Sequence, residues 1–222
     1  MRLALASWAS WLSVRSMKRA SGFTLVELLV VLSVTSIVFA LILPAVQHVR
    51  ESARATQCRH NLKQLGLAIT TYEETHRVLP PGWIGVGSQG LPDVEGPSGW
   101  SWGALLLTQL DQGSLSASID FQQPVKSAPT SIRQQVLSGF RCPSDPTSVD
   151  HMAVPSRLNH NLMLTELAVA NYVGSFGSTD IQDCLSNPLG KPCIGDGPLF
   201  QNSSTRWVSF VDGTSQTFLI GE

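Results

Sequence analysis

Ser21-Gly22-Phe23-Thr24-Leu25-Val26-Glu27 leads directly into a long apolar segment, and Glu27 is the only formally charged side chain from Phe23 to Val49. The run from Leu28 to Val46 is mostly Leu, Val, Ile, Ala and Phe. It is long enough to span a bilayer, which takes about 20 apolar residues. An ionised Glu costs about 2.5 kcal/mol or more at the bilayer centre, so acids in membrane segments usually have a function or a partner. We expect the partner of Glu27 to be a free amine.

Cleavage after Gly22 would place the new amino group of Phe23 one helical turn before Glu27, the spacing at which helix neighbours meet. A neighbouring subunit could supply the amine instead. The motif resembles, at every position, the class III signal of type IV pilins and type II secretion pseudopilins, Gly-Phe-Thr-Leu-(Val/Ile)-Glu before an apolar helix. The resemblance implies that prepilin peptidase cuts after Gly22 and methylates the Phe23 amine. It also implies that Glu27 registers the subunit during assembly with other pilin or pseudopilin subunits.

Two other kinds of N-terminal segment are alternatives to a prepilin signal. The first is an uncleaved signal anchor, in which Glu27 has no partner. The second, a secretory signal peptide, fits less well because its apolar core has about 7 to 15 residues and ends at a small-x-small cleavage site. No such site closes this segment.

The charges that flank the apolar run predict its orientation. The basic residues Arg2, Arg15, Lys18 and Arg19 all precede it. Positive charge stays cytoplasmic, so we expect a single pass through the inner membrane with the C-terminal part periplasmic, or extracellular in a filament. Residues 1–22 are the predicted leader. Met17 is a candidate start, because residues 17–22 alone would make a typical short leader.

Pro44 lies inside the apparent helix, where proline removes a backbone hydrogen bond and kinks or breaks the helix. Pilin helices that resemble this one carry a proline at the corresponding place. Neighbouring helices in a membrane or filament can satisfy the freed groups. We therefore interpret Pro44 as a helix kink, with the end of the membrane span as the alternative.

The sequence after residue 46 becomes polar but keeps an apolar face. Apolar residues recur at steps of three and four at Ala55, Cys58, Leu62, Leu65, Ile69 and Tyr72. This period predicts an amphipathic continuation, residues 47–76, of a transmembrane and assembly helix, residues 23–46. We expect one helix of about 50 residues that ends before Leu79-Pro80-Pro81-Gly82.

Residues 77–222 are enough for one soluble domain. We expect a loop at 85–99, short helices at 104–110 and 131–137, and strands at 168–176, 206–211 and 217–220, with a turn at 212–214. Helix first and strands later indicates an α+β architecture. The expected fold is type IV pilin-like, with the long N-terminal helix packed on a small antiparallel sheet with Gly- and Pro-rich loops.

A narrower resemblance covers most of the chain after Gly22. It rests on Gln57-Cys58-Arg59-His60-Asn61-Leu62-Lys63-Gln64-Leu65-Gly66-Leu67-Ala68, Leu79-Pro80-Pro81-Gly82, Phe140-Arg141-Cys142-Pro143-Ser144-Asp145-Pro146, Asn171-Tyr172-Val173-Gly174 and residues 212–222. These segments are similar to the DUF1559 family, planctomycete-type prepilin-like proteins whose biochemical role is poorly defined. Members of that family usually continue past the Gly-Glu pair into further strands. The resemblance therefore implies a truncated or divergent member, in which the strand at 217–220 would be a bare edge.

The four cysteines lie outside the apolar run, which fits an oxidising compartment. Cys184 and Cys193 flank a short loop that is easy to close, so we expect them to pair. Cys58 and Cys142 would then make the second bridge, although four cysteines allow three pairings. A metal site is the weaker interpretation, because no Cys-x-x-Cys or His-x-x-x-His spacing accompanies them.

The remaining polar residues predict no catalytic centre and no cofactor. The five histidines, His48, His60, His76, His151 and His160, are scattered in polar contexts, where we expect solvated side chains. The aspartates Asp145, Asp180, Asp183, Asp196 and Asp212 occur beside turn residues. They leave calcium as a minor alternative, since Asp196-Gly197 lacks the acidic repetition of an EF-hand. Hydrolase, kinase, zincin and dinucleotide motifs are absent from the sequence, so we do not expect an enzyme.

Two functions from different classes follow. The net charge of -1 argues against a dedicated nucleic-acid surface. The favoured function is a structural subunit of a type IV pilus or type II secretion pseudopilus. The alternative is a membrane-tethered periplasmic or surface binding module, in which Trp83, Trp100 and Trp102 would line a ligand site, although such tryptophans are more often packing anchors.

Overall fold

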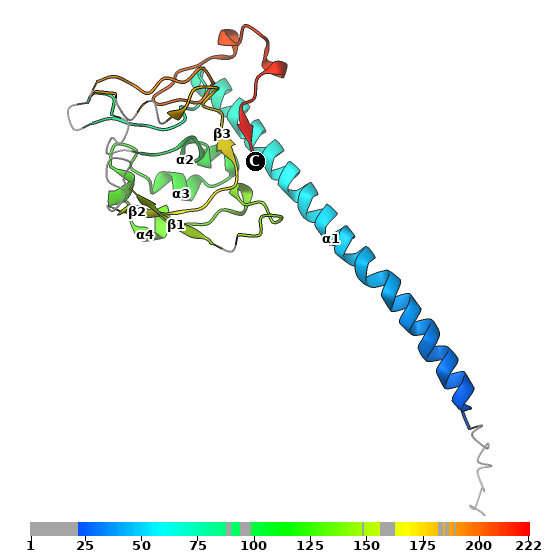
Figure 1. Ribbon diagram of the computed structural model, residues 1–222. Coiled ribbons are helices and arrows are strands. Elements are labelled where there is room, and N and C mark those ends of the chain that lie inside the picture. Colours follow the sequence, from blue (N-terminus) through cyan, green and yellow to red (C-terminus); the bar gives the residue numbers. More distant parts are fainter. Residues whose placement is uncertain are drawn as a thin grey trace, which may run out of the picture. The chain divides into compact units, whose positions relative to one another are not determined.

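The structure is a computed structural model that describes residues 22–87, 90–93, 99–147, 149–155, 163–181, 184, 187–188 and 190–222. The chain forms two compact units, which divide between His48 and Val49. The helix α1 (Leu25–His76) begins in the first unit and continues into the second, which holds the other elements of the described residues (Figure 1). Of the predicted leader, only Gly22 lies among the described residues, so the candidate start Met17 lies outside them.

The single helix of 52 residues confirms the predicted long helix. Its buried side chains are Cys58, Asn61, Leu65, Ala68 and Ile69, which recur at steps of three and four. The helix ends where expected, because Arg77 adopts a left-handed φ of 63° and its N–H donates to the Glu73 carbonyl at 2.7 Å. Leu79, fully buried, then begins the extended Pro-Pro segment.

Short elements make up the rest of the second unit. In chain order they are α2 (Trp102–Leu105), η1 (Leu107–Leu110), α3 (Gly113–Ala117), η2 (Val125–Ser127), α4 (Thr130–Arg133), η3 (Ser138–Phe140), β1 (His151–Pro155), β2 (Met163–Ala168), β3 (Val173–Gly174), η5 (Trp207–Ser209), η6 (Thr214–Gln216) and β4 (Ile220–Gly221). Two antiparallel pairs form, β1 with β2 and β3 with β4. The fold is thus α+β and pilin-like, a long helix with small antiparallel sheets.

The predicted strand at 206–211 is wrong, because the segment forms the 3₁₀ turn η5. Trp207 and Phe210 pack against the core and against each other, with ring centroids 5.6 Å apart. Their spacing of three suits a turn rather than the two-residue period of a strand. Val208 and Val211, beside them, are 88% and 96% exposed.

The other predicted elements are present but shorter. The predicted strand 168–176 is only β3, after a β2 that ends at Ala168, and 217–220 gives only β4. The β3–β4 ladder contains only two residue pairs, Val173 with Gly221 and Gly174 with Ile220. The predicted helix at 104–110 is divided between α2 and η1, and that at 131–137 is the single turn α4.

The core of the second unit joins one face of α1 to the short helices and loops. Its fully buried members include Leu65, Ile69, Leu79 and Leu106. Asn61 is buried among them, and its side-chain amide donates to the Ser138 and Arg141 carbonyls at 3.1 and 2.9 Å. This polar contact fixes η3 against α1, because a buried amide requires hydrogen-bond partners.

Candidate processing and assembly site

The first turn of α1 contains a reciprocal pair of hydrogen bonds between Thr24 and Glu27. The backbone N–H and the hydroxyl of Thr24 both donate to Glu27 Oε2 at 2.8 Å, and the Glu27 N–H donates back to Thr24 Oγ1 at 3.3 Å. The Thr24 carbonyl accepts the first helical bond, from Leu28, at 3.2 Å. Thr24 is therefore the N-cap and Glu27 the third helical residue of a capping box.

This capping box is a role that the sequence interpretation missed. The Thr-x-x-Glu spacing immediately before an apolar run is itself the signal for it. In the structure, the carboxylate of Glu27 is hydrogen-bonded to Thr24 of its own chain, and Phe23 precedes the helix. The role of Glu27 toward a Phe23 amine stays a prediction, as does cleavage after Gly22.

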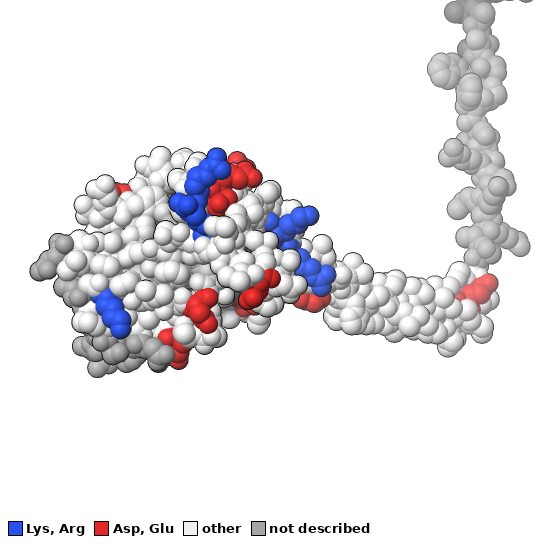
Figure 2. Space-filling view, turned by 90° about the horizontal axis from the view of Figure 1, so that it is seen from above, with Lys and Arg blue, Asp and Glu red and all other residues white. Residues whose placement is uncertain are grey.

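The helical surface that follows Glu27 is apolar and solvent-exposed. Every residue from Gly22 to Val49 is exposed, and Figure 2 shows the apolar stretch as white apart from an acidic group near its start. The helix is long and apolar enough to cross a membrane. Such a helix near the N-terminus is consistent with a membrane anchor.

The hydroxyl groups inside the apolar stretch are all paired within the helix. Ser33, Thr35 and Ser36 donate to backbone carbonyls three or four residues earlier, at 2.8 to 3.0 Å. These bonds remove the cost of bringing free hydroxyls into an apolar environment. Pro44 lies inside α1, which continues on both sides of it, and its kink stays a prediction.

The two disulfides join the cysteine pairs that the sequence favoured. Cys58 on α1 bonds to Cys142 with their Cα atoms 4.9 Å apart, and Cys184 bonds to Cys193 at 5.2 Å. The first bridge fixes the turn after η3 directly on the long helix. Both bridges agree with an oxidising compartment for the second unit.

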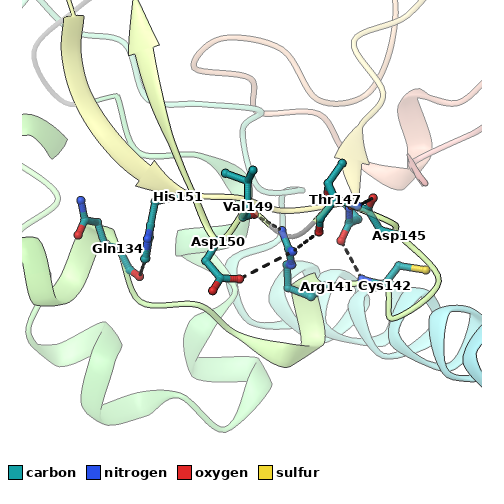
Figure 3. Close-up of polar contacts among 9 residues, drawn as sticks. Gln134, Arg141, Cys142, Asp145, Thr147, Val149, Asp150 and His151 are labelled. Carbon is teal, nitrogen blue, oxygen red and sulfur yellow. Dashed lines mark hydrogen bonds and ion pairs between the residues drawn. The ribbon is translucent and has the colours of Figure 1, made fainter.

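The turn around Cys142 is held by two further groups, Asp145 and Arg141 (Figure 3). Asp145 accepts from the N–H and hydroxyl of Thr147 at 2.9 and 2.7 Å, and from the amide of Asn171. These hydrogen bonds hold the pKa of Asp145 below its ordinary value, and the bond from the Thr147 hydroxyl has the largest effect on it. Arg141 donates to the carbonyls of Val149 and Thr147 at 3.1 and 3.3 Å. The polar side chains of this turn thus bond to the turn itself, so we interpret it as a structural feature and not as a ligand site.

The three tryptophans proposed for a ligand site do not line one cavity together. Trp100 and Trp102 line one cavity in the second unit, but Trp83 is not among its lining residues. Trp83 packs on Phe176 with ring centroids 6.1 Å apart. Trp83 therefore lies beside the segment of the other two through its bridge to Ser101, but its ring packs on Phe176 and does not line the cavity.

The other candidate ligand residues gather into no metal site among the described residues. The only group of three potential ligands found there is Cys58, Cys142 and Glu222, and its two cysteines form a disulfide. The described histidines, His48, His60, His76 and His151, are exposed as expected. Asp196 accepts from the Ser178 hydroxyl and N–H, which lower its pKa. Asp212 is exposed, whereas His160 and Asp183 lie outside the described residues.

Two family models match the chain. Residues 17–43 match the "Prokaryotic N-terminal methylation motif", and residues 47–222 match "Protein of unknown function (DUF1559)". No curated protein and no solved structure matches. Neither family description names an enzymatic activity. Because the second match covers more than half of the chain and the first places a methylation motif on the apolar helix, the protein is a prepilin-like member of the DUF1559 family.

Proposed function

We propose that this protein is a structural subunit that prepilin peptidase cleaves after Gly22 and methylates at Phe23, and that assembles through α1 into a type IV pilus or a type II secretion pseudopilus. The observation that carries the proposal is the position of Glu27, the only formally charged side chain in an apolar stretch that is exposed throughout. The match to a methylation motif over residues 17–43 supports the processing step.

The apolar surface explains why the subunit would polymerise. In the membrane, the exposed Leu, Val and Ile side chains of α1 contact lipid; in a filament, they would contact the same helix of neighbouring subunits. Removal of Glu27 from lipid favours the filament, because its carboxylate would there pair with the Phe23 amine of a neighbour. The subunit thus supplies both the apolar surface and the one charge that sets its register.

The basic residues before the apolar run and the disulfides after it support one orientation. Arg15, Lys18 and Arg19 favour a cytoplasmic leader. Two disulfides in the second unit require an oxidising environment, which supports a periplasmic or extracellular location. We infer a single-pass inner-membrane precursor whose second unit is exported.

The first test is the intact mass and N-terminal sequence of the protein from native membranes. The proposal expects a chain that begins at N-methylated Phe23. A chain that retains the residues before Gly22 would instead make the protein a signal-anchored domain.

The second test is Glu27→Ala, with Glu51→Ala as the matched control. Glu51 is an exposed carboxylate of the same helix beyond the apolar run, where it pairs with Arg54 at 3.3 Å. Glu27→Ala should stay membrane-bound and be cleaved yet yield no filaments, whereas Glu51→Ala should assemble. Equal filament yield from both variants would overturn the assembly role of Glu27.

A second candidate function, a membrane-tethered binding module, is favoured by one observation: the cavity lined by Trp100 and Trp102 in the second unit. A tethered module would lose no function in the Glu27→Ala variant. The same variant therefore separates the two candidates.

A further inference from the structure

The second unit contains a cavity of about 240 Å³ with mainly apolar walls. Seven elements contribute to these walls, namely α2, η1, α3, η2, α4, η3 and β2. Their apolar lining residues include Trp102, Leu107, Leu115, Phe140 and Leu167. The volume corresponds to about eight water molecules at liquid density, or an organic molecule of about ten non-hydrogen atoms. Cavities that combine apolar walls with a few polar groups are the usual form of small-molecule sites.

Arg133 is the one formally charged side chain among the residues found to line this cavity. Its Nη1 donates to the carbonyls of Lys126 and Ala128 at 3.2 and 3.3 Å. Its Nε is buried and has no hydrogen-bond partner within the described structure. The ion pairs found among the described residues do not include Arg133. The one cation that lines the cavity is thus without a carboxylate partner among the described residues, and an anionic ligand could supply one.

Two tryptophans line the cavity. The first, Trp100, is buried. Its indole N–H already donates to the Gln123 carbonyl at 3.1 Å, so the ring offers the cavity an apolar surface and no spare donor. Trp102 is also buried and packs on Phe140 with ring centroids 5.9 Å apart. Aromatic walls of this kind favour a flat apolar ligand body.

We propose that this cavity binds a small monocarboxylate with an aromatic or short aliphatic body, whose carboxylate pairs with the guanidinium of Arg133. One negative charge balances the one cation of the lining, and an N–H of arginine bonded to a carboxylate is among the stronger hydrogen bonds in proteins. A doubly charged phosphate would leave uncompensated charge in apolar surroundings. This site lies in the second unit and does not depend on whether the chain assembles into filaments.

Binding can be measured on the full-length protein in detergent with four probes, namely benzoate, phenylacetate, 3-phenylpropanoate and hexanoate. Ligand-observed NMR and tryptophan fluorescence report on the complex. For ligands of this size we expect at least one Kd of about 1 mM or below. The primary amide of each bound acid has nearly the same shape without the charge, and it should bind at least about tenfold more weakly.

Arg133→Met tests the assigned residue, and Arg206→Met is its matched control, because Arg206 is exposed and is not among the lining residues. Arg133→Met should abolish the preference for acid over amide, whereas Arg206→Met should retain it. No binding of any probe up to about 10 mM would overturn the proposal. Equal affinity for acid and amide in the unmodified protein would also overturn the proposal. That comparison does not depend on whether the Arg133→Met variant folds. Filament yield is measured separately, so failure here leaves the assembly proposal unaffected.

Discussion

The hydroxyl of Tyr172 donates a buried hydrogen bond to the backbone carbonyl of Cys58 at 3.0 Å, across 114 residues of chain. Cys58 also forms the disulfide to Cys142, whose N–H donates to the side chain of Asn171 at 2.8 Å. One turn of α1 is thus connected to the Cys142 turn and to the segment before β3. These contacts hold the Cys142 turn and the segment before β3 on the part of α1 that belongs to the second unit.

Tyr172→Phe should lower the free energy of unfolding by about 1 kcal/mol, because the helical carbonyl loses a buried donor while the ring still fills its place. Tyr72→Phe is the matched control, since Tyr72 is the other tyrosine and its hydroxyl has no hydrogen bond among the described contacts. Urea denaturation of both variants, followed by tryptophan fluorescence, measures the difference. Equal losses would show that the Tyr172 hydroxyl contributes nothing specific.

The two disulfides should differ in their contributions to stability, because they close loops of different length. Cys58 and Cys142 are 84 residues apart, and Cys184 and Cys193 are 9 apart. The chain-entropy model gives about 4.5 kcal/mol for the long loop and about 2.5 kcal/mol for the short one. Paired Cys→Ser variants, unfolded in urea, should show this order. A larger loss from the Cys184–Cys193 pair would contradict the entropic explanation.

Gly177→Ala should destabilise the second unit by about 2 kcal/mol or more. Gly177 has a φ of 114°, and an added Cβ would lie 1.8 Å from Asp196 Oδ1. The change would therefore both strain the backbone and displace the carboxylate that accepts from Ser178. Gly139→Ala is the control, since no atom lies within 4 Å of its added Cβ and its φ is not positive. Equal melting temperatures for the two variants would contradict this prediction.

Stability should fall in acid as Asp145 and Asp196 become protonated. Hydrogen bonds from Thr147 and from Ser178, respectively, lower the pKa of each carboxyl in the folded protein. Their stabilisation is therefore present above the unfolded pKa, about 3.9, and is lost as the pH falls through the folded pKa. Asp145→Asn and Asp196→Asn should be less stable near neutrality and less sensitive to acid. A steeper loss of stability in acid than in the unmodified protein would contradict the assignment.

The sequence predicted the features that depend on local period and chemistry. The recurrence of Cys58, Leu65 and Ile69 gave the buried face of α1, and Leu79-Pro80 gave its end. The short loop between Cys184 and Cys193 predicted one disulfide, and Cys58 and Cys142 were then the cysteines left for the other. Each of these signals acts over a few residues, so it can be detected without the tertiary structure.

The features that depend on distant partners could not be predicted in this way. Asn61 looked like one more polar residue of the helix, and only the carbonyls of Ser138 and Arg141 explain its burial. Arg133 likewise stands in a polar segment, and its place in a cavity wall depends on elements from Gly99 to Tyr172. The strand predicted at 206–211 was wrong because tertiary contacts of Trp207 and Phe210 override the local alternation.

Thr24→Val and Glu27→Gln should separate the two roles that the structure and the motif give to Glu27. Thr24→Val removes the hydroxyl of the capping box but leaves the charge, so it should weaken the helix start by about 1 kcal/mol and still permit assembly. Glu27→Gln keeps an oxygen that can accept from Thr24 but removes the charge, so it should be cleaved and methylated yet yield no filaments. Intact mass reports processing, and the protein released by shearing cells reports filaments. If Glu27→Gln assembles like the unmodified protein while Thr24→Val does not, Glu27 acts as a helix cap and its pairing with a subunit amine is wrong.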